Sequence, residues 1–119
     1  MAKAGATGIT RIINAAGYSW LGFKAAFKNE AAFRQELGLT LTLAPIALYF
    51  GQSYADKAIL IASLIFILLI EILNSAIEAV VDRHGDEIHE LSGRAKDMGS
   101  AAVLLAFVIA GLVWFSVFI

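Results

Sequence analysis

Three long apolar stretches alternate with short polar ones along this chain. Residues 37–55 and 98–119 carry no charge, and residues 58–81 are mostly apolar but contain a stripe of polar side chains. Each stretch is long enough to cross about 30 Å of hydrocarbon as a helix. The pattern predicts an all-α integral membrane fold with three transmembrane helices. A short turn near residues 51–57 joins the first two as an antiparallel hairpin.

The first third of the chain follows a different pattern. It predicts an amphipathic helix over residues 1–35, lying on the membrane surface with Trp20 near the lipid headgroups. An ordinary amphipathic helix of a soluble protein is the alternative, and the surface helix is favoured because it leads directly into a span. The apolar residues that recur at helical spacing are Ile9, Ile12, Ile13, Ala16, Trp20, Phe23 and Phe27.

The composition also favours a membrane protein of one small domain. Of the 119 residues, 60% are hydrophobic and 16% are charged, whereas roughly 25% of the residues of soluble domains are charged. The net charge of −1 gives no reason to expect a nucleic-acid partner. The absence of cysteine excludes disulfides and thiol chemistry. Residues 1–20 lack a compact apolar core followed by a small-residue cleavage site, so we expect no signal peptide.

The positive charges predict the orientation of the chain in the membrane. Five basic residues precede the first predicted span, and three more lie at 82–97, which we expect to be a loop. The opposite side has only Lys57. The positive-inside rule therefore places the N-terminus and the 82–97 loop in the cytoplasm.

The polar stripe of the second span is the strongest chemical signal in the sequence. At 100° per residue, Glu71, Asn74, Ser75, Glu78 and Asp82 fall on one helix face. A charged side chain at mid-bilayer costs roughly 2.5–3.5 kcal/mol. We therefore expect the two glutamates to meet a metal, a proton, a basic partner or a substrate. Three helices shield such a face poorly from lipid, so we also expect a homo-oligomer with this face turned inward.

Further charged residues are expected at the same cytoplasmic interface. Glu30 and Glu36 lie at the end of the surface helix. Glu30 and Glu78 together are suited to Mg²⁺, which proteins bind through one or two carboxylates plus phosphate oxygens. Acids for a metal, bases for phosphate and one deeper acid for a hydroxyl are typical of phosphoryl transfer. The candidate bases are Arg11, Lys24, Arg94 and Lys96.

No standard nucleotide-binding motif accompanies these residues. Gly17 and Gly22 are spaced like the glycines of a P-loop, but the following residues are not Gly-Lys-Ser/Thr, and no strand precedes them. The acids and Asn74 also have purely structural explanations that stay open at this point. These are a protonated Glu71 bonded across a helix interface, an interhelical hydrogen bond from Asn74, an ion pair of Glu78 with Arg83, and one of Glu30 with Arg34.

Three segments of the chain resemble the prokaryotic diacylglycerol kinase family. They are residues 71–82 (Glu-Ile-Leu-Asn-Ser-Ala-Ile-Glu-Ala-Val-Val-Asp), residues 30–36 (Glu-Ala-Ala-Phe-Arg-Gln-Glu) and residues 93–100 (Gly-Arg-Ala-Lys-Asp-Met-Gly-Ser). The resemblance covers the whole chain. It implies a homotrimeric bundle in the bacterial inner membrane, with composite active sites shared between subunits. It also implies phosphorylation of diacylglycerol by ATP with Mg²⁺.

The same resemblance implies roles for individual residues. Glu71 resembles the general base, and Asn74 the residue that orients the base or the lipid hydroxyl. Glu30 and Glu78 resemble the metal-holding pair. The residues implied for nucleotide binding are Arg11, Tyr18, Glu30, Glu78, Glu87, His89, Lys96 and Asp97. Those implied for binding the lipid substrate are Arg11, Ser19, Trp20, Glu36, Glu71 and Ser100.

Other functions stay open alongside the diacylglycerol kinase. One branch of the family phosphorylates undecaprenol, and Glu-Ile-Leu-Asn-Ser at 71–75 favours the diacylglycerol branch instead. A small proton-coupled membrane transporter is an alternative from a different class, although such proteins usually have four spans. A structural assembly peptide, whose acids only fix the register of an oligomer, is a third.

Overall fold

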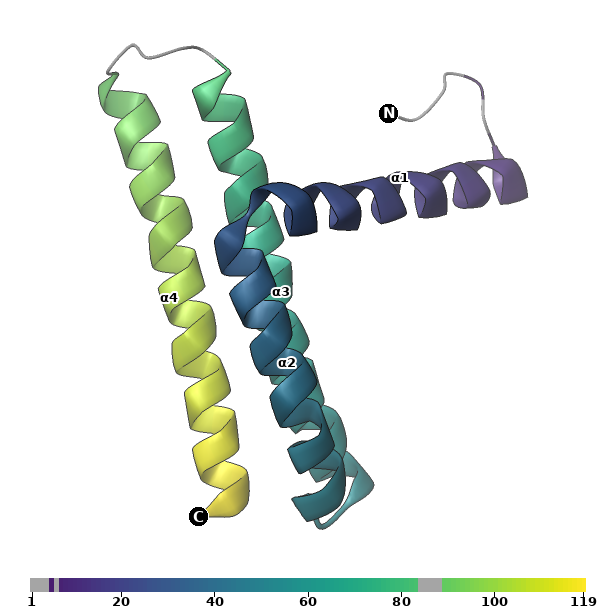
Figure 1. Cartoon of the computed structure of the whole chain (residues 1–119), viewed down its shortest axis with the longest axis vertical. Coiled ribbons are helices and arrows are strands. Elements are labelled where there is room, and N and C mark those ends of the chain that lie inside the picture. Colours follow the sequence, from purple (N-terminus) through teal and green to yellow (C-terminus); the bar gives the residue numbers. More distant parts are fainter. Residues whose placement is uncertain (1–4, 6, 84–88) are drawn as a thin grey trace.

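The computed structural model of this chain describes residue 5, residues 7–83 and residues 89–119. Its helices are α1 (Gly8–Asn29), α2 (Ala31–Phe50), α3 (Tyr54–Asp82) and α4 (Glu90–Phe118), and the described part contains no strand. Helices α2, α3 and α4 run lengthwise beside one another, and α1 extends crosswise from the start of α2 (Figure 1). The all-α fold predicted from the sequence is confirmed.

The chain turns sharply at Glu30, between α1 and α2. The backbone of Glu30 is extended, with φ −117° and ψ 107°, so a single residue separates the two helices. Arg34 stabilises this corner from the first turn of α2. Its Nη1 donates hydrogen bonds to the carbonyl oxygens of Phe27 at 2.7 Å and Lys28 at 3.2 Å. These carbonyls belong to the last turn of α1, where the helix itself supplies no N–H partner.

The corner corrects two expectations. The helix predicted over residues 1–35 is divided between α1 and α2, because the extended residue at position 30 interrupts it. Arg34 directs its guanidinium to the end of α1, and the ion pair considered between Glu30 and Arg34 is not among those of the described residues.

Replacing Arg34 is expected to loosen this corner. Arg34→Ala removes both hydrogen bonds to the last carbonyls of α1, which should lower the stability by about 1–2 kcal/mol. The melting temperature of the purified protein in detergent measures this loss. Arg94→Ala is the matched control, because the contact of Arg94 within the described residues is an exposed ion pair with Glu90 at 3.5 Å, and such pairs contribute about 0–1 kcal/mol. Equal melting temperatures for the two variants would contradict the role of Arg34.

Two of the three predicted spans are helices long and apolar enough to cross a membrane, namely α3 and α4. The stretch predicted at residues 37–55 is not helical throughout, because α2 ends at Phe50 and a turn follows. Its charge-free helical part, residues 37–50, rises only about 21 Å at 1.5 Å per residue. The 82–97 segment also differs from the expected loop, since α4 begins at Glu90.

The hairpin predicted between the first two spans is present. Helix α2 ends at Phe50, and α3 begins at Tyr54 and returns beside α2 (Figure 1). The Ser53 side chain caps α3 by accepting a hydrogen bond from the Asp56 amide at 3.0 Å. Pro45 lies inside α2.

Helices α3 and α4 pack through small residues and one polar link. Ala106 and Ala110 of α4 lie against Ile67 of α3, because alanines let two helix backbones approach closely. Further along the same interface, the buried Ser63 hydroxyl accepts a hydrogen bond from Trp114 Nε1 at 3.1 Å. These contacts hold the second half of α4 beside α3.

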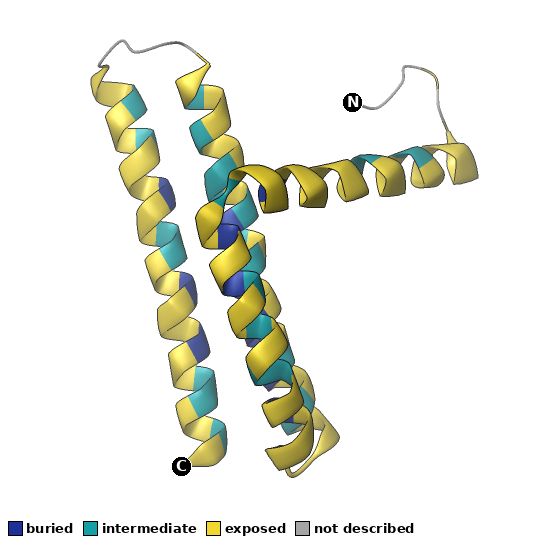
Figure 2. Ribbon diagram, viewed as in Figure 1, coloured by how far each residue is buried: buried dark blue, intermediate teal, exposed yellow. Residues whose placement is uncertain are grey.

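Most of the apolar surface of the bundle faces outward. Figure 2 shows buried residues only along the inner faces of the helices and exposed residues over most of the remaining surface. Leu73 on α3 is 53% exposed and Leu104 on α4 is 64% exposed. Soluble monomers rarely expose contiguous apolar patches above a few hundred Å². The outer surface is therefore suited to contact with hydrocarbon or with other copies of the chain.

Candidate functional site

The stripe predicted on the second span forms a hydrogen-bonded cluster on α3. Asn74 Nδ2 donates to Glu71 Oε2 at 3.4 Å and to Glu78 Oε1 at 3.1 Å. Only the NH₂ end of the amide can donate, so the two carboxylates determine its orientation. Among the described residues, Asn74 bonds within its own helix and Glu78 bonds to Asn74, so the interhelical hydrogen bond of Asn74 and the ion pair of Glu78 with Arg83 are not found there.

Helix α2 adds a third acid to this cluster. The Glu36 carboxyl lies within hydrogen-bonding reach of the Glu71 carboxyl. Both side chains are buried, with Glu36 8% and Glu71 5% exposed. Glu36 Oε2 is buried and accepts no hydrogen bond from a donor group of the described residues. Like charges on two buried carboxylates in contact would repel each other strongly.

A second polar contact joins the ends of α3 and α4. Lys96 Nζ lies 2.7 Å from Asp82 Oδ1. The two side chains are 44% and 61% exposed, so the pair adds little stability. Lys96 and Asp82 therefore stay accessible to a charged ligand at this end of the bundle.

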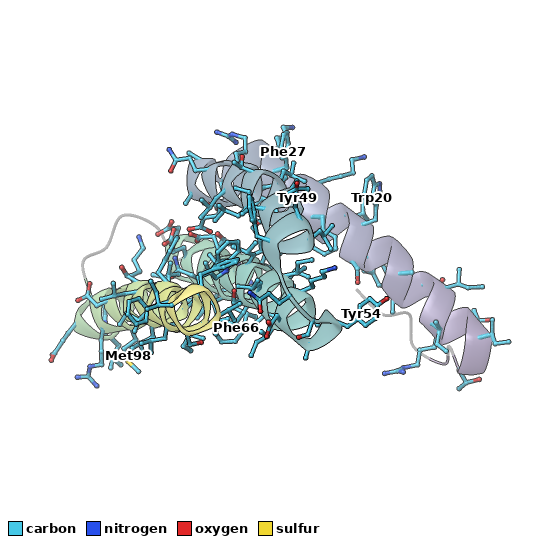
Figure 3. The ribbon with its side chains drawn as sticks, turned by 90° about the horizontal axis from the view of Figure 1, so that it is seen from below. Trp20, Phe27, Tyr49, Tyr54, Phe66 and Met98 are labelled. Carbon is cyan, nitrogen blue, oxygen red and sulfur yellow. The ribbon has the colours of Figure 1, made fainter. Side chains whose placement is uncertain are left out.

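The candidate residues of α1 are not brought to this cluster within one chain. Arg11 lies near the end of α1 that points away from α3 and α4 (Figure 1). Ser19 donates a local hydrogen bond to the Ala15 carbonyl at 2.9 Å. Trp20 is 64% exposed on α1 (Figure 3). Tyr18 is half-buried on the same helix.

The remaining candidates lie at three separate places. Glu30 is half-buried at the corner between α1 and α2. His89 caps α4 by accepting a hydrogen bond from the Leu91 amide at its Nδ1, at 3.0 Å. Asp97 and Ser100 are exposed on α4. Glu87 lies outside the described residues.

Within residues 7–83 and 89–119, no three His, Asp or Glu side chains lie together as a metal site would require. Mg²⁺ does not need such a group, because one or two carboxylates and phosphate oxygens suffice. Glu78 fits this requirement in part, since only its Oε1 is engaged by Asn74 in the described chain. A second carboxylate, from Glu30, would complete the protein's share of the ligands.

A cavity of about 700 Å³ lies in the corner between α1 and α2 and reaches α3. Its walls are mainly apolar, which suits the acyl chains of a lipid. Sequence reasoning missed the contributions of α2 and α3 to this cavity, since they depend on the turn at Glu30. The lining residues are Trp20, Phe23, Lys24, Ala25, Phe27, Lys28, Asn29, Phe33, Leu37 and Leu68.

The fold and the site define a small helical membrane protein with a partly buried cluster of acids and one amide. The family described as prokaryotic diacylglycerol kinase matches residues 17–118, and the chain belongs to this family. It is 58% identical over 108 residues to the diacylglycerol kinase of Escherichia coli (strain K12), covering 91% of this chain and 88% of that protein.

Two further relatives are similar over nearly the same share of the chain. The diacylglycerol kinase of Haemophilus influenzae is 50% identical over 108 residues, covering 91% of this chain and 92% of the relative. That of Pseudomonas aeruginosa is 50% identical over 110 residues, covering 92% and 89%. The family assigned from residues 30–36, 71–82 and 93–100 is thereby confirmed.

Proposed function

We propose that this chain phosphorylates diacylglycerol to phosphatidic acid with ATP as the phosphoryl donor. Membership of the family and 50–58% identity to relatives named diacylglycerol kinase support this reaction. One structural observation supports the chemistry most directly. It is the partly buried cluster in which Asn74 joins Glu71 and Glu78, with Glu36 beside Glu71.

Glu71 is the general base of the proposed reaction. As the primary hydroxyl of the lipid attacks the γ-phosphorus, its proton passes to the Glu71 carboxylate, and the bond from the γ-phosphorus to the leaving ADP oxygen breaks. Asn74 orients Glu71 through its Nδ2 hydrogen bond. Glu36 lies beside Glu71, within hydrogen-bonding reach of its carboxyl.

Glu30 and Glu78 are the proposed ligands of Mg²⁺, which when bound would neutralise charge on the phosphates. Lys96 and Arg11 supply positive charge to the polyphosphate, with Asp97 beside them. Tyr18, Glu87 and His89 are proposed to lie near the nucleoside. Ser19, Trp20, Glu36 and Ser100 are proposed to contact the lipid substrate.

The proposed assembly is a homotrimer in the bacterial inner membrane, with the N-terminus in the cytoplasm. In it α1 lies on the membrane surface and α2, α3 and α4 span the membrane. The exposed apolar surface of the bundle supports a partner or lipid around it. The position of Arg11, far along α1 from the acid cluster, supports active sites shared between neighbouring subunits.

Transfer of labelled phosphate tests the proposed function. Purified protein in mixed micelles, supplied with γ-labelled MgATP, is expected to label diacylglycerol and not undecaprenol. A preference for undecaprenol would keep the phosphoryl transfer and change the substrate. No labelling of either lipid by folded protein, together with proton-driven dye uptake into proteoliposomes without ATP, would replace the kinase by a transporter.

A further inference from the structure

One glycine of α4 lies directly against the amide of Asn74. Gly99 is buried, and a Cβ added to it would overlap Asn74 Oδ1 and lie 3.2 Å from Asn74 Cγ. Among the glycines of the described chain, only Gly51 and Gly99 would bring a Cβ within 4 Å of neighbouring atoms. Gly51 lies in the turn between α2 and α3, so Gly99 alone occupies such a position between packed helices.

The two ends of the Asn74 amide have different surroundings. Nδ2 donates to Glu71 and Glu78, whereas Oδ1 is buried and accepts no hydrogen bond within the described residues. Leaving a buried acceptor without a partner costs about 1–3 kcal/mol. Stability alone therefore does not explain why the amide points its oxygen at Gly99. The hydrogen bonds to the two carboxylates explain it.

We propose that Gly99 is a positioning residue for the phosphoryl-transfer site, because its missing side chain leaves room for the Asn74 amide to bridge Glu71 and Glu78. The inference rests on the proposed function, since Gly99 acts only through Asn74. Any side chain at position 99 would turn the amide away from the carboxylates. The Asn74 side chain can change its rotamer, so the amide can move away while α3 and α4 stay packed.

Gly99→Ala separates this role from a general packing role. It is expected to lower kcat about 10- to 100-fold, as loss of an orienting partner typically does. The KM for diacylglycerol and the melting temperature should stay close to those of the unchanged protein. Gly111→Ala is the matched control on the same helix, since a Cβ there meets nothing within 4 Å. A Gly99→Ala variant with unchanged kcat would overturn the proposal.

A double-mutant cycle with Asn74→Ala tests whether Gly99 acts through the amide. Once the amide is gone, the added methyl group should have no further effect. The double variant is therefore expected to have the same kcat as Asn74→Ala alone. If the fold losses in kcat of the two single variants multiply in the double variant, Gly99 acts elsewhere and the proposal is overturned.

The cycle also covers a Gly99→Ala variant that does not fold. Asn74→Ala in the same chain removes the overlap, so the double variant should then regain its melting transition, and its failure to do so would overturn the proposal. Full activity of Asn74→Ala alone would contradict the role proposed for Asn74 itself, and with it the role of Gly99. A loss of kcat in Asn74→Ala with no loss of kcat in Gly99→Ala would overturn the role of Gly99 only.

Discussion

Glu71→Gln is expected to abolish phosphate transfer to diacylglycerol while leaving the fold intact. Glutamine has the same shape and can still bond to Asn74 and Glu36, but it cannot accept the proton of the lipid hydroxyl. Loss of a general base typically lowers the rate by a factor of about 10²–10⁴. Incorporation of γ-labelled phosphate into extracted lipid measures the rate, and the melting temperature and nucleotide binding measure the fold.

Two variants with the same chemical change control this experiment. Glu90→Gln alters an exposed acid that pairs only with Arg94 in the described chain, and it should leave the rate unchanged. Glu36→Gln alters the other member of the carboxyl pair. It should lose far less than Glu71→Gln, because glutamine keeps the shape of Glu36 and its amide can still donate a hydrogen bond to Glu71. If Glu71→Gln kept most of its turnover, Glu71 would not be the base.

The acid cluster was predictable from the sequence because it depends on helix geometry within α3. Residues three and four apart lie on one face of any α-helix. The spacing of Glu71, Asn74 and Glu78 therefore placed them together before any tertiary contact was known. The lengths of the apolar stretches at 58–81 and 98–119 predicted α3 and α4, because a helix must have about 20 apolar residues to cross the membrane.

The contacts that complete the cluster come from other helices, so the sequence alone did not reveal them. Glu36 reaches Glu71 only because α2 packs beside α3. Gly99 looks like any other helical glycine until α4 is placed against Asn74. A local sequence pattern does not show which faces of the helices pack together.

The corner at Glu30 was missed for a different reason. Glycine and proline are the usual sequence signals of a helix end, and neither occurs at this break. Arg34 stabilises the corner through carbonyl oxygens of α1, and the sequence offered a simpler partner for it in Glu30. The acid at the corner is thereby left free of that ion pair, as a metal ligand would need to be.

The direction of α1 bears on how the site is assembled. Glu30 lies at the start of α2, and the rest of the proposed nucleotide-binding residues of α1 lie further away from α3 (Figure 1). Within one chain, Glu30 and Glu78 are not part of any cluster of three metal-binding side chains in the described residues. A neighbouring subunit that supplies its own α1 and Glu30 would complete the site.

Mixed oligomers of two inactive variants are therefore expected to regain activity. Glu30→Gln and Glu71→Gln should each abolish transfer when present in every subunit. In a mixture, a Glu71→Gln subunit can supply Glu30 to a neighbour that retains Glu71. Random mixing of equal amounts leaves roughly one quarter of such shared sites intact. Co-expression with two different affinity tags, followed by sequential purification, isolates the mixed oligomers for the labelled-phosphate assay.

The matched control combines Glu71→Gln with Asn74→Ala. Both residues belong to the hydrogen-bonded cluster of α3, so each site has them from the same subunit and every mixed site lacks one of them. This pair should stay inactive, whereas the Glu30→Gln and Glu71→Gln pair regains activity. If the first pair also stays inactive, Glu30 and Glu71 act within one chain. In that case α1 must fold back toward α3, and the site would have to be assembled by a rearrangement at the Arg34 corner.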